Sequence, residues 1–163
     1  MADTNVTKPK IKKLIKEYLD EANLMQLATV SNGKPWICSM WFVADEDLNL
    51  YLFSSITTRH SQEISKDSSV AVAICLPHIP TENKVRSIQL EGTAELLTDP
   101  NDIETAIGHC VERIFTLEQI KQFMSHPNEP HRFYRIKPTK IILTDTVNLP
   151  DSPRQEYVPA TTK

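Results

Sequence analysis

A two-residue turn signal near the start of the chain constrains its fold more than any other feature. Asn32 and Gly33 stand between two apolar runs, Leu24–Val30 and Pro35–Ala44. Asn-Gly is the strongest short-range signal for a β-hairpin, because both residues accept the positive φ that a tight turn between twisted strands requires. The sequence therefore predicts two adjacent antiparallel strands joined by residues 31–34.

Four further segments have the composition and length of strands. They are Leu48–Phe53, Val70–Ile74, Val85–Leu97 and His131–Leu143. Gly92 interrupts the third of these segments and predicts a bulge or bend in a curved sheet. With the hairpin, the chain thus offers six strands.

Helical periodicity is confined to a few places. An amphipathic helix is expected over 8–22, a short one over about 57–66, and a pair over about 103–115 and 117–124. Strands and helices do not alternate regularly, which argues against a doubly wound parallel sheet. We expect a mainly β fold with flanking helices (α+β), built as an antiparallel six-stranded split β-barrel.

The composition is that of one globular domain. The chain has 163 residues, of which 40% are hydrophobic and 24% charged, enough to bury a core. We expect a single domain over residues 1–147. The segment 148–163 contains three prolines and is expected to be an extended or loosely ordered tail.

Charge and apolar patterning exclude several classes of protein. The net charge of −3 and the pI near 5.9 argue against a nucleic-acid partner, which usually requires a basic face. No apolar run approaches 18 residues and the N-terminus lacks the apolar core of a signal peptide, so we expect no membrane segment and a cytoplasmic location. The odd number of cysteines (Cys38, Cys75 and Cys110) favours reduced, buried thiols over a disulfide framework.

A polar turn follows the strand Leu48–Phe53 and carries the clearest functional signal. Hydroxyls, a guanidinium and an imidazole occur within seven positions, at Ser54, Ser55, Thr57, Thr58, Arg59 and His60. Such groups at the start of a helix form an anion site, with phosphate as the expected anion. The alternative is ordinary Ser/Thr capping with a surface arginine.

The order of these motifs resembles a known family. LYLFSSITTRHSQEI, RSIQLEGTAELL and FYRIKPTKI, with the hairpin before them, are similar to the FMN-binding split barrel of the pyridoxamine-phosphate-oxidase-like superfamily, over about residues 10–145. The resemblance is to a small bacterial group rather than to the vitamin B6 oxidases proper. It implies a homodimer with FMN in a groove at the interface.

The resemblance also implies which residues bind the cofactor. The phosphate would be held by Phe53, Ser54, Thr58, Arg59 and His60. The family usually has lysine where His60 stands, and histidine is largely neutral at pH 7, which predicts a weaker or more pH-sensitive site.

The flavin ring in this family lies along the second strand. This places Ser39, Met40 and Trp41 at the ring, whereas Trp36 is expected to make a core or dimer contact. A polar residue from the Leu-Glu-Gly strand meets the ring as well. The family often carries glutamine where Ser87 lies, and Gln89 is on the same face of that strand, with Ile88 and Leu90 on the other.

The chain departs from the vitamin B6 oxidases at its C-terminal end. It lacks their arginine-rich final strand, so oxidation of vitamin B6 is not expected. The loop from His126 to His131 matches no metal motif and reads as a surface loop, and no catalytic residue can be named.

Two functions therefore remain open. One is an FMN-dependent oxidoreductase or reductase acting on a small-molecule substrate, with a nicotinamide donor. The other is a flavin- or haem-binding module without turnover, such as a sensor or carrier.

Overall fold

The computed structural model describes residues 6–77, 82, 84–111 and 113–160. Its helices are α1 (Lys8–Glu21), α2 (Arg59–Ile64), α3 (Pro100–Cys110) and α4 (Leu117–Met124). Its strands are β1 (Leu24–Ser31), β2 (Lys34–Trp41), β3 (Val43–Ala44), β4 (Leu50–Ser55), β5 (Ser69–Cys75), β6 (Arg86–Leu96), β7 (His131–Asp145) and β8 (Arg154–Tyr157).

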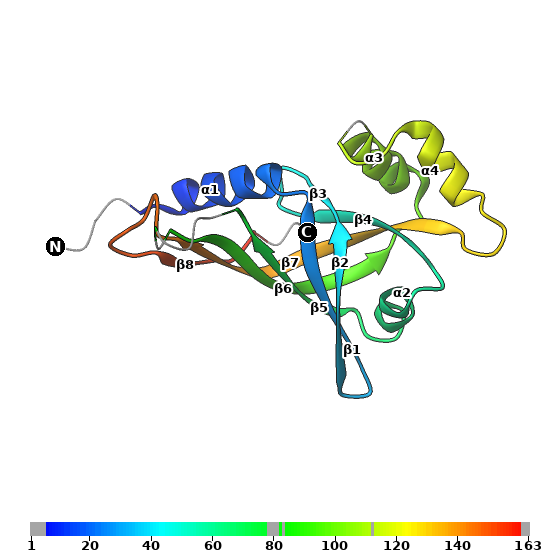
Figure 1. Ribbon diagram of the computed structural model, residues 1–163, viewed down its shortest axis with the longest axis horizontal. Coiled ribbons are helices and arrows are strands. Elements are labelled where there is room, and N and C mark those ends of the chain that lie inside the picture. Colours follow the sequence, from blue (N-terminus) through cyan, green and yellow to red (C-terminus); the bar gives the residue numbers. More distant parts are fainter. Residues whose placement is uncertain (1–5, 78–81, 83, 112, 161–163) are drawn as a thin grey trace.

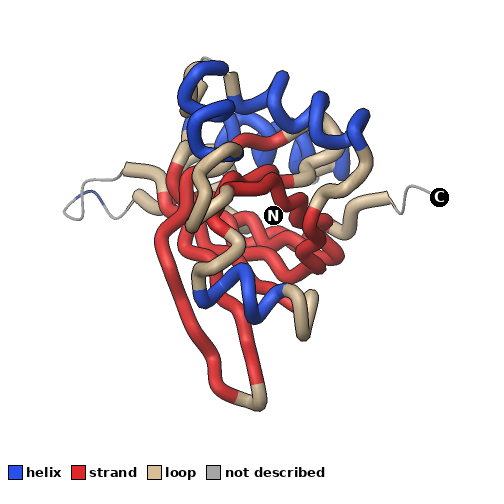
Figure 2. The backbone as a smooth tube through the Cα atoms, turned by 90° about the vertical axis from the view of Figure 1, so that its right-hand side faces the viewer, coloured by secondary structure: helices blue, strands red, loops and turns tan. Residues whose placement is uncertain are grey.

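The predicted hairpin is present as β1 and β2. Asn32 and Gly33 both have positive φ, 51° and 72°, as a tight hairpin turn requires. The two strands pair antiparallel along their whole length, with Ser31 opposite Lys34 at the turn. The hairpin tip extends away from the rest of the fold (Figures 1 and 2).

All described strand pairs are antiparallel and form one sheet. The strand order is β2-β1-β5-β6-β7-β4-β3, with β8 added to β7. This sheet curls into a half-barrel, with the described helices α1–α4 around it, which confirms the fold class expected from the sequence. β2 lies at one end of the strand order, yet the curl brings it beside β4 and α2.

The described part of the chain has eight strands where six were expected. The expected strand 35–44 is divided, because it ends at Trp41 and a separate short strand, β3, follows Phe42. The other addition is β8, which pairs with β7 and lies beyond residue 147, the expected end of the domain. At least this part of the tail is thus a strand of the sheet, while residues 161–163 lie outside the described range.

Gly92 bends β6 as predicted. The register with β7 shifts between Glu91 and Gly92. A Cβ atom built on Gly92 would lie 2.3 Å from the backbone oxygen of Lys137, so only glycine permits this close approach of the two strands.

The barrel interior is the main hydrophobic core. α1 covers it with one apolar stripe, which buries Ile11, Leu14, Ile15, Tyr18 and Leu19. At the C-terminal end of β7, the buried Asp145 accepts a hydrogen bond from the hydroxyl of Tyr18 at 2.5 Å, which fixes α1 to the sheet.

A second, smaller core lies under the helix pair α3 and α4, at the opposite end of the molecule from the start of α1 (Figure 1). Phe53 and Phe133 stack at its centre, with ring centroids 4.5 Å apart. α3 ends at Cys110 rather than near 115, and a separate capping box of Thr116 and Gln119 begins α4. This second core places Phe115, between the two helices, next to the sheet.

The three cysteines differ in burial. Cys110 is buried and Cys38 is partly buried, as expected for reduced thiols, but Cys75 is exposed. The expectation of a buried thiol was wrong at Cys75 because alternate residues of β5 face outward, and Cys75 is one of them.

Within the described residues, the helices are all too short or too polar to cross a membrane.

Candidate functional site

The two ends of the curled sheet meet where β2 contacts β4 and α2, and we call this junction, with the pocket that opens at it, the groove. Cys38 from β2 spans it, since its Sγ atom lies 3.5 Å from Nδ1 of His60 in α2. Most of the predicted cofactor residues belong to these three elements.

His60 is the centre of a buried polar cluster on the β4–α2 side. Its Nε2 atom lies 2.7 Å from Oγ of Ser54 and 3.0 Å from Oγ1 of Thr58. Burial lowers the pKa of His60, an effect that the nearby Glu63 carboxylate opposes. With both ring nitrogens against protein groups and a lowered pKa, the imidazole is held neutral and turned inward.

Arg59 has a different environment from its neighbour. Its Nε donates to Oε1 of Glu63 at 2.8 Å, and its guanidinium carbon lies 4.3 Å from the centre of the Trp36 ring. The Arg59 side chain is still 48% exposed. The cationic group of the predicted anion site is therefore fixed and accessible.

The helix that follows the polar turn is shorter than expected. α2 has six residues, Arg59–Ile64, where about ten were predicted, and its N-cap Thr58 makes no side-chain capping bond. So short a helix has little dipole, and the side chains carry the anion-binding potential of this turn.

Next to this cluster lies an aromatic pocket of about 340 Å³, lined by Leu24, Ser39, Met40, Trp41, Phe53 and Phe115. Ser39, Met40 and Trp41 were predicted to lie at the flavin ring, whereas Phe53 was predicted to lie at the phosphate. Phe115 lies edge-on to both Trp41 and Phe53, with ring centroids 5.8 Å and 5.7 Å apart. The lining is apolar apart from the Ser39 hydroxyl, which donates to the side-chain oxygen of Gln26 at 3.0 Å.

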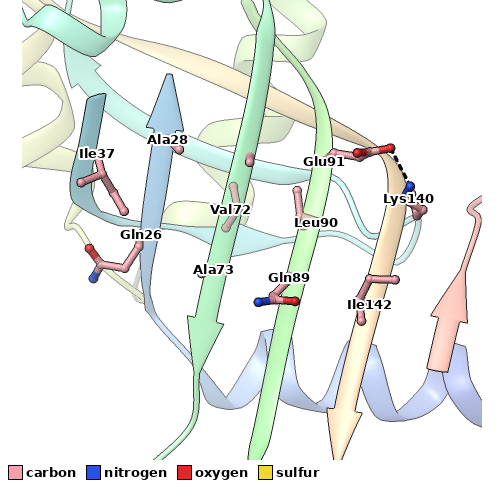
Figure 3. Close-up of a pocket in the computed structure, with 11 residues that line it drawn as sticks. Gln26, Ala28, Ile37, Val72, Ala73, Gln89, Leu90, Glu91, Lys140 and Ile142 are labelled. Carbon is pink, nitrogen blue, oxygen red and sulfur yellow. Dashed lines mark ion pairs between the residues drawn. The ribbon is translucent and has the colours of Figure 1, made fainter. Parts of the chain in front are cut away.

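Ser87 and Gln89 are not part of this pocket. They lie on the outer face of β6, with Ile88 and Leu90 turned into the core, as the alternation predicted. Figure 3 shows Gln89 in a second, shallow pocket of about 340 Å³ on the outer face of the sheet, together with Gln26, Ala73 and Ile142. At its edge an ion pair joins Glu91 and Lys140, with 3.2 Å between Oε1 and Nζ.

The structure adds residues that sequence reasoning did not select. Phe115 and Leu24 complete the aromatic pocket, Cys38 contacts His60, and Glu63 binds Arg59. Of these contacts, only the one between Glu63 and Arg59 could be predicted from the local sequence, because the two residues are four positions apart on a helix and of opposite charge. The others come from distant segments.

The described residues contain no group of three or more histidine, cysteine or acidic side chains able to hold a metal ion. In the loop 126–131, His126 accepts a hydrogen bond from the backbone N–H of Glu129, and His131 packs against the rings of Phe53 and Phe123.

The antiparallel half-barrel defines a small split-barrel protein. Its groove contains an aromatic pocket and an arginine, which together form a candidate cofactor site. The pyridoxamine 5'-phosphate oxidase family model matches residues 11–145. The chain therefore belongs to the pyridoxamine 5'-phosphate oxidase-like family, which confirms the resemblance noted in the sequence.

Solved structures with this fold include cofactor-binding proteins. A haem-binding protein from Mycobacterium smegmatis has a TM-score of 0.74 and 14% identity, over 94% of this chain and 60% of that protein. An FAD-binding protein from Mesorhizobium loti has a TM-score of 0.59 and 18% identity, over 77% of this chain and 87% of its own. The haem storage protein HutZ from Vibrio cholerae has a TM-score of 0.61 and 19% identity, with coverages of 80% and 88%. Identities this low establish the shared fold alone.

A comparison with curated proteins gave no match.

Proposed function

We propose that this protein is a cytoplasmic FMN-binding protein that acts as a flavin-dependent oxidoreductase or reductase of a small molecule, with a nicotinamide donor. The observation that carries the proposal is the meeting of Ser39, Met40, Trp41 and Phe53 around one pocket. These residues come from two strands that are brought together only by the curl of the sheet. Arg59, which is accessible, contacts Trp36 on one of these strands, β2.

The groups in the groove fit the two ends of FMN. An uncharged lining with three aromatic side chains suits a flat, largely apolar ring. The Arg59 guanidinium suits a phosphate, because its planar fork offers charge-assisted hydrogen bonds. The bound flavin supplies the electron chemistry, whereas the protein binds it, orients it and limits access of water.

We further propose that the protein functions as a two-fold homodimer. β2 is almost entirely exposed in the single chain, including Ile37 at 60% and Trp41 at 54%. Large apolar side chains on an edge strand indicate a surface that a partner covers. Ser87 and Gln89 lie on the outer face, away from the aromatic pocket of their own chain, so they can contribute to a cofactor site only across such an interface.

The second candidate function is a flavin- or haem-binding module without turnover. It is favoured by the haem-binding and haem-storage proteins among the structures that share this fold. It also agrees with the groove itself, in which no side chain has an evident catalytic role. Haem would place its propionates, rather than a phosphate, near Arg59.

A visible absorption spectrum of the purified protein distinguishes these functions. FMN binding predicts flavin bands after incubation with FMN, and bleaching of these bands by NADH or NADPH supports the oxidoreductase. Flavin bands that neither donor bleaches support the module instead. A Soret band after incubation with haemin, with no uptake of FMN, would overturn flavin binding in favour of haem.

A further inference from the structure

The guanidinium of Arg59 is held on two sides. Glu63 accepts its Nε–H at 2.8 Å, and the ring of Trp36 covers it at 4.3 Å. Within the described part of the chain, no hydrogen bond reaches the two terminal nitrogens of this group. These nitrogens form the end of the fork that binds anions most effectively.

Glu63 is itself fixed in place. Its side chain is buried, and the hydroxyl of Thr29 in β1 donates to its second carboxylate oxygen at 2.5 Å. The hydrogen bonds from Thr29 and then Arg59 lower the pKa of Glu63, so the carboxyl is ionised at neutral pH. One oxygen therefore binds the sheet and the other binds Arg59.

The two contacts that hold Arg59 both depend on one pair of residues that face each other in the β1–β2 hairpin. Thr29 and Trp36 are directly paired in the β1–β2 ladder, and paired residues project their side chains on the same face. Thr29 fixes Glu63 while Trp36 covers Arg59, so the hairpin and α2 together leave the guanidinium little freedom.

We propose that Glu63 and Trp36 are positioning residues that hold the Arg59 fork ready for the phosphate of a flavin bound in the groove. The inference rests on the proposed function and gives the Arg59 fork a fixed orientation before the phosphate binds. A free arginine side chain loses rotamer freedom when it binds an anion, and fixing it beforehand removes that cost.

Glu63 has two opposing effects on an anion, which makes the proposal testable. As a negative charge it weakens phosphate binding, whereas as a hydrogen-bond acceptor it orients the fork. Glu63→Gln keeps an acceptor for Arg59 and a partner for Thr29 but removes the charge. Glu63→Ala removes the charge and the acceptor together.

The experiment measures the dissociation constants of FMN and riboflavin and compares their ratio, because riboflavin lacks only the phosphate. Positioning predicts that Glu63→Ala decreases the preference for FMN about fivefold, while Glu63→Gln preserves or increases it. Trp36→Leu should also decrease the preference, and Trp36→Phe, which keeps an aromatic face, should retain most of it. Glu17→Ala, an exposed acidic residue of α1, serves as the matched control.

The outcomes separate the two proposals. Loss of both flavins in equal proportion would mean that the substitutions only damage the fold, and would overturn positioning. An increased preference for FMN in both Glu63 variants would mean that Glu63 acts only as a charge, and would overturn it as well. A wild-type protein that binds neither flavin would overturn the proposed function itself, and the positioning role with it.

Discussion

Cys38 and His60, which lie on opposite sides of the groove, are in direct contact, with 3.5 Å between Sγ and Nδ1. The same imidazole contacts Ser54 and Thr58 through its other nitrogen, so one buried side chain links β2, β4 and α2. Its position in the chain is the one where the family usually has lysine. Here the imidazole connects the edge strand to the barrel, and we propose Arg59 as the residue that binds the phosphate.

The environment of His60 predicts a pH-dependent stability. Burial lowers its pKa from the ordinary 6.5, with Glu63 opposing the shift; Cys38 and Arg59 are the other titratable groups beside it. As the pH falls, His60 is therefore protonated at a higher pH in the unfolded chain than in the folded chain. The free energy of unfolding should fall as the pH decreases below 6.5. Urea unfolding at pH 7.5 and pH 5.5 measures this loss. His60→Gln should reduce it, and an equal loss in wild type and variant would contradict the assignment.

Removal of the Arg59 guanidinium should weaken FMN selectively. Arg59→Ala is expected to cost on the order of 2 kcal/mol of binding, roughly thirtyfold in affinity, because a charge-assisted contact to the phosphate is lost. Arg59→Lys should recover only part of this, since lysine keeps the charge but lacks the fork. Fluorescence titration with FMN and riboflavin measures both effects. An unchanged affinity for FMN in a folded variant would place the phosphate elsewhere.

Truncation of Phe115 should affect both flavins alike. Its ring lines the aromatic pocket from the α3–α4 connection, and Arg59 is not among the residues that line this pocket. Phe115→Ala is therefore expected to weaken FMN and riboflavin each by about fivefold, in line with the loss of one aromatic contact. The same titrations test this, with Leu117→Ala, an exposed residue of α4, as the control. A selective loss of FMN would show that the pocket does not hold the ring.

A charge on the exposed face of β2 should prevent dimerisation. Ile37 is 60% exposed in the single chain, and burial of an unpaired carboxylate at an apolar interface is strongly unfavourable. Light scattering at micromolar concentration should give a dimer for wild type and a monomer for Ile37→Asp. Leu117→Asp should remain dimeric. A monomeric wild type would contradict the dimer and the shared cofactor site.

Two glycines should respond in opposite directions to alanine. Gly92→Ala places a methyl group against the backbone of Lys137 and is expected to destabilise the protein by about 3 kcal/mol. Gly108→Ala has open space in α3 and should stabilise it by about 0.5–1 kcal/mol. Chemical denaturation compares the two. Similar changes at both sites would mean that the contact between β6 and β7 is not as close as described.

The sequence by itself determined the local elements of this protein. Asn32 and Gly33 specified the hairpin, and the alternation around Gln89 specified the outer and inner faces of β6. Gly92 marked the bend. Each of these depends on backbone preference or side-chain periodicity within a few residues, so no distant contact was needed to predict them.

Only the tertiary structure decided how the groove is composed. Trp36 covers Arg59 across 23 positions of sequence, Cys38 meets His60, and Phe115 reaches Trp41 from the helix pair. The division of the second strand at Phe42 and the pairing of β8 were also missed. These features depend on how far the sheet curls and on which side chains then meet. The curl is the sum of small twists between neighbouring strands over the whole sheet, and packing in both cores sets its extent. No short segment of the chain encodes that packing.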